Sequence, residues 1–318
     1  MCSVKKTIKL YIDFKLDSSA GAGKFCKRLS DALEKQGVCM SSNKECNIAL
    51  RIIRGRTSIR SKWVLRVDGV HIEKDKGKVH KNKVIVEAIK KSNYVIFQSE
   101  YCRKLANNVL GFTPERNRVI FNGANPNVYA VDNKLRVYKK NVIISNRYAV
   151  TKGKTHKRLK EMVGIAVEYC ETHKDVGFWF AGKISGKKPN CGDQIKFLGD
   201  VPEEDLRKYV ATADVMLHLA WYDPCPNSVV EALVAGTPVI CASGSGTEEI
   251  VGDAGSALNL GDVPLGIITN STPPQFNSEL VYDALDKWLK KRVRVKKPEL
   301  YINNIARQYK EVFYETIS

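Results

Sequence analysis

Short apolar runs alternate with helix-like segments along most of this chain, and this alternation constrains the fold more than any other feature. The runs read as β-strands at 8–14, 47–53, 63–67, 94–98, 142–145, 176–181, 195–199, 215–219 and 238–242. Several of the intervening segments repeat apolar residues at helical spacing. Strands that alternate with helices form parallel sheets, because a parallel connection needs a crossover. The sequence therefore predicts an α/β protein with doubly wound parallel sheets.

The length of the chain indicates more than one domain. A chain of 318 residues is long for one hydrophobic core and comfortable for two. Residues 124–140 look like a linker, with Asn and Pro followed by a charged run. We therefore predict an N-terminal Rossmann-like domain at 1–136 and a second one at 137–298. The amphipathic segment 299–318 predicts a final helix.

The stretch from Trp221 to Ile240 reads as loop, helix, turn and strand. Prolines keep the chain out of a helix until Asn227 or Ser228, and either side chain can cap the helix. Gly236 stands where a left-handed C-cap falls, and Pro238 blocks continuation. The stretch therefore predicts a short helix that leads directly into a strand.

Two carboxylates, Asp223 in the loop and Glu231 on the helix, flank this helix start. The first N–H groups of a helix lack backbone partners and its dipole favours negative charge, so the start is a candidate phosphate site. An acid that accepts hydrogen bonds from sugar hydroxyls beside such a site suits a nucleotide sugar. The alternative interpretation is that Asp223 only precedes a turn proline and Glu231 is a solvated helix residue.

The stretch resembles the donor-site motif of the retaining glycosyltransferases of family 4, a group 1 type with the GT-B fold. The family pattern is Glu, seven residues, Glu and a Gly-x-Pro-Val turn. Here Asp223, Glu231 and the turn at 236–239 occupy these places, with Asp for the first Glu. The resemblance implies two Rossmann-like domains facing across a cleft, with the final helix packing back on the first. It also implies sugar transfer from a nucleotide-sugar donor to a glycan, lipid or protein-linked acceptor with retention.

The resemblance assigns donor-binding cations to the segment after the strand at 142–145. Family members carry an Arg and a Lys here that neutralise the donor phosphates. Arg147 with Lys152 fits the family spacing, whereas the helix register from Leu159 onward favours Lys157, so both lysines remain candidates. With these cations in place the scheme needs no metal or other cofactor, and the chain has no Asp-x-Asp pair to bind one.

Further donor-site residues follow from position. Asn227 and Ser228 lie at the helix start, where N–H groups can meet a phosphate. The Gly-rich segment 243–250 matches a family loop that closes over the donor sugar, with Thr247 and Glu249 in corresponding places. On this scheme Glu231 holds the ribose, whereas Asp223 holds sugar hydroxyls.

The N-terminal domain offers a weaker set of candidate site residues. Gly21, Ala22 and Gly23 follow the first strand, where the family has a Gly-rich loop near the donor diphosphate, although the segment is not a Walker A motif. Asp68 stands at the end of a strand, where open α/β sheets place ligands. Many family members have a catalytic-site His near this point. Here only Asp68 and His71 are found, and neither is a clean match.

The net charge of +18 lies wholly in the first half, because residues 141–318 are neutral in sum. One interpretation is a solvated surface. The other is that this half meets an anionic acceptor, or makes peripheral contact with a membrane. The scattered cysteines fit reduced thiols, and there is neither a transmembrane run nor a signal-peptide pattern, so we expect a cytoplasmic protein.

Two other classes of function compete with the glycosyltransferase. A sugar-nucleotide epimerase of the same fold would need a His/carboxylate set placed around one sugar, which the sequence does not offer convincingly. A non-catalytic protein that binds nucleic acid or other anions would use the basic half, but no aromatic-basic motif of the RNA-binding kind is present, so we expect no nucleic acid.

Overall fold

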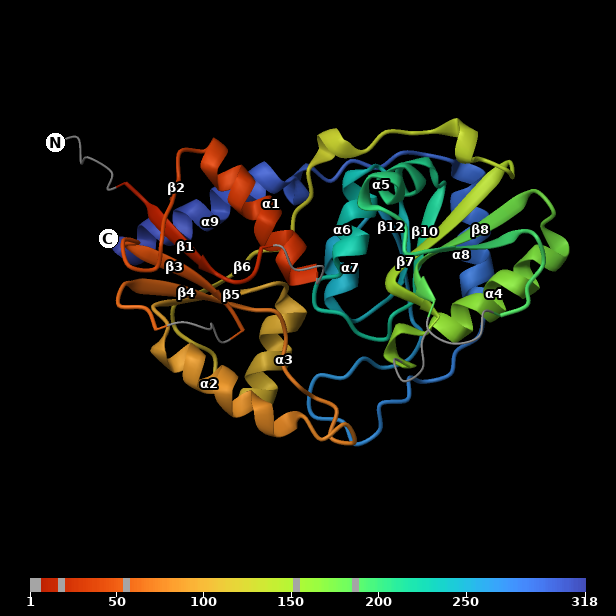
Figure 1. The fold of residues 1–318 in the computed structure, drawn as a ribbon. Coiled ribbons are helices and arrows are strands. Elements are labelled where there is room, and N and C mark those ends of the chain that lie inside the picture. The colour runs from red at the N-terminus through yellow and green to blue at the C-terminus, as the bar shows by residue number, and fades with distance from the viewer. Residues whose placement is uncertain (1–6, 17–20, 54–57, 151–154, 185–188) are drawn as a thin grey trace. The chain divides into compact units, whose positions relative to one another are not determined.

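The computed structural model describes residues 7–16, 21–53, 58–150, 155–184 and 189–318, without the side chains of 147–150 and 184. The chain forms two compact units (Figure 1). Unit 1 comprises residues 1–125, 264–270 and 299–318, and unit 2 comprises residues 126–263 and 271–298. Each unit is built around one six-stranded sheet, and all the strand pairs are parallel.

The sheet of unit 1 has the order β2-β1-β3-β4-β5-β6. Its strands are β1 (Lys9–Asp13), β2 (Cys39–Met40), β3 (Ile48–Ile52), β4 (Lys62–Val67), β5 (Tyr94–Phe97) and β6 (Asn117–Val119). This is a flavodoxin-like order, in which the strand order reverses between β1 and β3. The predicted strands from 8–14 to 94–98 are confirmed, with ends that differ by one residue.

Helices cover both faces of this sheet. They are α1 (Gly21–Lys35), α2 (Asn82–Lys91), α3 (Glu100–Leu110) and α9 (Ile302–Ile317). On one face, Phe25 of α1 and Tyr309 of α9 belong to a core with residues of β1, β3, β4 and β5. On the other face, α2 and α3 pack through residues such as Ile89 and Cys102. The final helix is thus part of the unit 1 core.

Unit 2 has the strand order β12-β11-β10-β7-β8-β9. Its strands are β7 (Lys140–Val150), β8 (Val176–Ile184), β9 (Ile195–Gly199), β10 (Val215–His218), β11 (Val239–Ala242) and β12 (Gly255–Leu258). Read from the first strand of the unit, this is the order 3-2-1-4-5-6 of the Rossmann fold. The order reverses between β7 and β10, which pair at the centre of the sheet.

The helices of unit 2 are α4 (Leu159–Thr172), α5 (Glu203–Thr212), α6 (Asn227–Val234), α7 (Gly246–Val251) and α8 (Glu279–Lys291). Single 3-10 turns lie in both units, at Val79–Lys81, Pro126–Val128, Asn133–Leu135, Thr155–Lys157 and Pro298–Leu300. Met162 of α4 and Trp288 of α8 share a core with one face of the sheet. On the other face, Trp179 of β8 packs edge-on against Tyr209 of α5, with ring centroids 5.0 Å apart.

Some predicted boundaries were wrong. Helix α1 begins at Gly21, so the predicted Gly-rich loop is already helical over Gly21–Gly23. Helix α6 is capped by Pro226 without a side-chain bond, and the predicted cap Asn227 is its first residue. Part of the predicted Gly-rich loop at 243–250 is helix α7, because the Ser245 side chain accepts a hydrogen bond from the N–H of Thr247. By contrast, Gly236 follows α6 with the expected left-handed φ of +87°.

A segment that lies between parts of unit 2 in sequence belongs to unit 1. Within residues 264–270, the carbonyl of Ile268 accepts a hydrogen bond from Lys74 N at 2.9 Å, and its N–H donates to Ile72 O at 2.9 Å. The Tyr101 hydroxyl donates to Pro264 O at 2.8 Å. The sequence did not predict this segment, because these partners are far apart along the chain.

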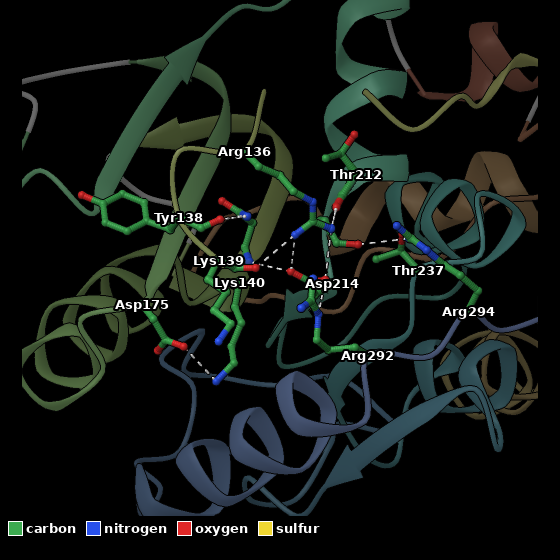
Figure 2. Close-up of polar contacts among 12 residues, drawn as sticks. Arg136, Tyr138, Lys139, Lys140, Asp175, Thr212, Asp214, Thr237, Arg292 and Arg294 are labelled. Carbon is green, nitrogen blue, oxygen red and sulfur yellow. Dashed lines mark hydrogen bonds and ion pairs between the residues drawn. The ribbon is translucent and has the colours of Figure 1, made fainter. Parts of the chain in front are cut away.

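The buried carboxylate of Asp214 contacts both the segment before β7 and the segment after α8 (Figure 2). Asp214, just before β10, accepts two hydrogen bonds from Arg136, at 2.8 and 3.1 Å. It also accepts the backbone N–H of Asn141 at 2.8 Å and lies 3.5 Å from Nε of Arg292. Nearby, Arg294 donates to Thr237 Oγ1 at 3.0 Å. The segment before β7 and the segment after α8 are thereby held at one point.

Candidate active site

The candidate site lies where the strand order of unit 2 reverses. In open α/β sheets, ligands bind outside the carboxyl ends of the strands at such a reversal. Here the two strands are β7 and β10. Residues that follow β7 and residues that follow β10 therefore meet at one edge of the sheet. Lys157 comes from the first set and Asp223 from the second, and His218 is the last residue of β10 itself.

Lys157 and Asp223 form an ion pair at this edge. Nζ of Lys157 lies 2.5 Å from Oδ2 of Asp223, and the two side chains are 22% and 16% exposed. The other oxygen, Oδ1, accepts the N–H of Cys225 at 3.1 Å. Burial alone would raise the pKa of the Asp223 carboxyl, but the Lys157 ammonium and these hydrogen bonds hold it below its ordinary value. The Asp223 carboxyl is therefore ionised at neutral pH.

The loop after β10 is tied to the segment after β7. The N–H of Trp221 donates to His156 O at 2.7 Å, and the indole N–H donates to Asp262 O at 2.7 Å. The rings of Tyr222 and His156 stack with their centroids 5.2 Å apart. These contacts position Asp223 and Lys157, which directly follow Tyr222 and His156 in the sequence.

His218, the last residue of β10, is a site residue that the sequence did not reveal. Its side chain is buried, and no described residue forms a hydrogen bond with either ring nitrogen. Burial, reinforced by the positive charge of Lys157, lowers the pKa of His218 to about 4. The imidazole is therefore neutral at physiological pH. The only sequence signal was a histidine inside an apolar strand.

His218 should make the stability of the protein depend on pH. In the unfolded chain the imidazole takes up a proton below its ordinary pKa of about 6.5, whereas the folded protein does not until about pH 4. The unfolded state thus binds more protons in this window, so stability is lost as pH falls from 6.5 to 4. We expect a loss of about 2 kcal/mol between pH 7 and pH 5 from this group.

Urea unfolding at both pH values measures this loss, with His218→Gln as the neutral comparison. The difference between wild type and variant should shrink or reverse at pH 5. His80→Gln, a change at an exposed histidine of unit 1, is the matched control and should follow the wild type. Equal pH dependence in wild type and His218→Gln would contradict the prediction.

Arg158 is a second residue whose role the sequence did not show. It has a left-handed φ of +50°, and its side chain is 1% exposed. Nη2 donates to Leu260 O and to Pro274 O, both at 2.8 Å, and the guanidinium lies over the Phe276 ring. Arg158 therefore fixes the long loop after β12 against the start of α4, immediately after Lys157.

The remaining candidates in unit 2 lie on two short helices. Asn227, Ser228 and Glu231 are half-buried on α6, with Asn227 and Ser228 in its first turn. Thr247 on α7 is buried, and no described residue bonds to its hydroxyl, whereas Glu249 is half-buried. The other two predicted cations, Lys152 and the side chain of Arg147, lie outside the described residues.

The unit 1 candidates lie at the carboxyl ends of β1 and β4. Gly21, Ala22 and Gly23 form the first turn of α1. Asp68 follows β4, and its Oδ1 lies 2.8 Å from Nε of the buried Arg66. Burial raises the pKa of the Asp68 carboxyl, although Arg66 opposes this shift. The backbone of His71 is bound on both sides by the Asn82 amide, at 2.9 and 2.8 Å.

Other kinds of site are not found in the described part of the chain. It contains no group of three or more His, Cys, Asp or Glu side chains that could hold a metal ion. The cysteines in these ranges are free thiols. Within the same ranges, every helix is too short or too polar to cross a bilayer.

Solved structures with the same architecture identify the fold. Sucrose-phosphate synthase from Thermosynechococcus elongatus aligns with a TM-score of 0.68 at 13% identity, over 98% of this chain and 99% of that one. Anabaena HepE, solved with UDP and glucose, aligns at 0.62 and 15% identity, over 98% and 97%. WaaG, a glycosyltransferase of lipopolysaccharide biosynthesis, aligns at 0.59 and 13%, over 98% and 97%. The two Rossmann-like sheets thus form the GT-B fold of glycosyltransferases.

The family follows from the sequence of the second half. Residues 132–308, more than half of the chain, match the model of the glycosyl transferases group 1 family. The chain belongs to this family and is a glycosyltransferase. A curated relative, the O-antigen chain mannosyltransferase B of Escherichia coli, is 36% identical over 69 residues, which span 22% of this chain and 18% of that protein.

Proposed function

We propose that this protein is a retaining glycosyltransferase of family 4 that moves a sugar from a nucleotide-sugar donor to a glycan, lipid or protein-linked acceptor. The observation that carries the proposal is the Lys157–Asp223 pair, 2.5 Å apart at the strand reversal of unit 2. A fixed ammonium at this edge suits a diphosphate, and a fixed carboxylate suits sugar hydroxyls. The half-buried Glu231 on the neighbouring helix suits the ribose.

The chemistry of the proposal is electrostatic. As the bond between the sugar and the diphosphate breaks, negative charge accumulates on the leaving diphosphate. Arg147, one lysine (Lys157 or Lys152) and the N–H groups of the first turn of α6 at Asn227 and Ser228 stabilise this charge. Because the chain supplies these cations itself, the proposed reaction needs no metal ion.

The other candidates complete the proposed roles. On α7, Thr247 and Glu249 bind the donor sugar. In unit 1, Gly21, Ala22 and Gly23 approach the donor diphosphate with their N–H groups, because α1 begins there. Asp68 serves the acceptor side, where its raised pKa suits a group that exchanges a proton. We further propose that the reaction takes place in the cytoplasm.

The donor is proposed from the relatives. HepE was solved in complex with UDP-glucose, and the curated relative is a mannosyltransferase. UDP-glucose and a mannosyl nucleotide are therefore the first donors to examine, followed by other UDP, GDP and ADP sugars. The charge of the chain, +18, favours an acceptor that carries negative charge.

A thermal-shift panel of UDP, GDP and ADP sugars tests the proposed function. A donor present at about 100 times its Kd should stabilise the folded protein by about 2.7 kcal/mol and raise the melting temperature. Replacing Glu231 by Gln should abolish this shift without unfolding the protein, because the side chain is only half-buried. Glu204→Gln, on α5, is the matched control because its carboxylate is 83% exposed. An unchanged donor affinity in Glu231→Gln, measured by calorimetry, would remove Glu231 from the site.

A further inference from the structure

Two short runs of unit 2 hold an unusual concentration of positive charge. Residues 133–140 (NKLRVYKK) and 290–297 (KKRVRVKK) together contain ten of the 52 Lys and Arg and none of the 34 Asp and Glu. We call these two runs the basic strip. The second run lies in the half of the chain whose charge is zero in sum. The net charge of that half of the chain therefore gives no sign of this second basic run.

The tertiary structure brings the two runs together. Arg136 of the first run and Arg292 of the second both contact the Asp214 carboxylate, at 2.8 and 3.5 Å (Figure 2). Asp214 precedes β10 and Lys140 begins β7, so the strip lies at the amino ends of these strands. Lys157 and Asp223 follow the same strands and lie at the carboxyl ends. The strip is therefore separate from the candidate active site.

Most of the strip faces solvent. Lys134, Lys139, Lys290 and Lys296 are exposed. Two valines between the cations are also exposed, Val137 by 72% and Val293 by 44%. Apolar side chains that are exposed beside flexible cations can enter a lipid interface while the cations contact the headgroups.

Acidic side chains of unit 2 offset only part of this charge. Asp214 pairs with Arg136 and Arg292, Asp175 pairs with Lys140 at 3.2 Å, and Asp253 pairs with Lys297 at 3.8 Å. Each of these carboxylates carries one charge against the ten cations. The strip therefore keeps a strong net positive charge at neutral pH and favours an extended anionic surface.

We propose that the basic strip docks unit 2 on a membrane surface that contains anionic lipids. Clusters of four to eight Lys and Arg beside apolar residues bind anionic headgroups through their summed charge. Binding to single-stranded nucleic acid uses aromatic side chains on which bases stack. Tyr138, the only aromatic residue of the strip, instead packs its ring against Gly177. Every residue of the strip is described. Its valines are exposed, whereas its one aromatic side chain is half-buried and packed, and this combination favours lipid.

Co-sedimentation with vesicles tests the proposal. Wild-type protein is mixed with phosphatidylcholine vesicles that contain either no anionic lipid or 30% phosphatidylglycerol, at about 0.1 M and 1 M salt. We expect binding only to the anionic vesicles and its loss at 1 M salt, where the Debye length falls from about 10 Å to 3 Å. The quadruple variant K134S/K139S/K290S/K296S should bind more weakly, by on the order of fivefold for each lysine removed.

Three further variants identify which property of the strip binds the vesicles. The charge-matched control K78S/K83S/K90S/K91S removes four exposed lysines of unit 1 and should bind nearly as well as wild type. The lysine-to-arginine version of the strip variant should also bind. The double variant V137S/V293S should weaken binding at unchanged charge. Circular dichroism and the melting temperature establish that each variant is folded.

Several results would overturn the proposal. One is equal binding by wild type and the strip variant, and another is loss of binding in the unit 1 control alone. A third is preferential binding of a single-stranded RNA homopolymer, lost in the strip variant, with no binding to vesicles. Donor binding by the same variants is measured separately in the thermal-shift panel. A failure of the membrane proposal is therefore distinguishable from a failure of the proposed function.

Discussion

Replacing Lys157 by methionine should lower kcat with the best donor by a factor on the order of 10² to 10³, which corresponds to about 2.7–4 kcal/mol of lost transition-state stabilisation. The physical reason is that the ammonium, held 2.5 Å from Asp223, is proposed to neutralise charge that develops on the leaving diphosphate. Methionine keeps much of the length of the side chain and removes only its charge. We therefore expect the larger effect on kcat rather than on the KM for the donor.

Lys160→Met is the matched control for this prediction. Lys160 is an exposed residue near the start of α4, three positions after Lys157. Its replacement removes the same charge at nearly the same place in the sequence and should leave kcat within about twofold. If Lys157→Met turns over donor as fast as Lys160→Met does, Lys157 does not act on the leaving group. Urea unfolding of both variants separates lost chemistry from lost stability.

Replacing Asp214 by alanine should destabilise the protein by about 3 kcal/mol, near the lower end of the range for breaking a buried ion pair. The carboxylate is 5% exposed and satisfies Arg136, whose side chain is 17% exposed. Without it, the Arg136 guanidinium keeps its charge but loses two hydrogen bonds. Urea unfolding should show the loss directly, and the melting temperature should fall by roughly 6–12 °C.

Two control variants bracket this loss of stability. Asp200→Ala removes an exposed carboxylate that lies 3.3 Å from Lys183, and it should cost less than about 1 kcal/mol because exposed pairs contribute little. Asp214→Asn keeps the shape and part of the hydrogen bonding, so its effect should be intermediate. If Asp214→Ala is no less stable than Asp200→Ala, the cluster in Figure 2 does not hold the ends of unit 2 together.

Local features of the sequence predicted the elements that depend on neighbouring residues. Ser99 directly follows the predicted strand at 94–98 and caps α3, because its hydroxyl accepts the N–H of Cys102 at 3.0 Å. Gly236 was predicted to end a helix in a left-handed conformation, which it does. Both signals act within a few residues, so they are visible in a sequence without any knowledge of packing. The α/β class followed from the same local alternation.

Helix starts rich in glycine were predicted less well. Gly21–Gly23 read as a loop because glycine disfavours helices, yet α1 begins at Gly21. The apolar face of this helix packs against the sheet through residues such as Phe25 and Leu29, and this burial outweighs the local preference. The short helix α7 within 243–250 was not predicted, because this segment is also rich in glycine and was read as a loop.

Some residues of the candidate site were predicted from the sequence, whereas others were found only in the structure. The sequence marked Asp223 and Glu231 by a motif, but it left two lysines open for the phosphate cation. The structure pairs Lys157 with Asp223, 66 positions apart, whereas Lys152 lies outside the described residues. His218 went unnoticed because nothing in the sequence distinguishes a buried, unsatisfied imidazole from one that is bonded.

What the sequence determined by itself was the α/β class, the position of most strands, and the acidic motif at 223–231, because each is encoded by residues close together in the chain. What only the tertiary structure decided were contacts between distant residues. Arg136 meets Asp214 across 78 positions, and Arg158 meets Leu260 across 102. The basic strip likewise exists only because one residue of each run, Arg136 and Arg292, contacts the same carboxylate. Such contacts depend on how the sheet is ordered, and strand order is fixed by the packing of the whole unit rather than by any local signal.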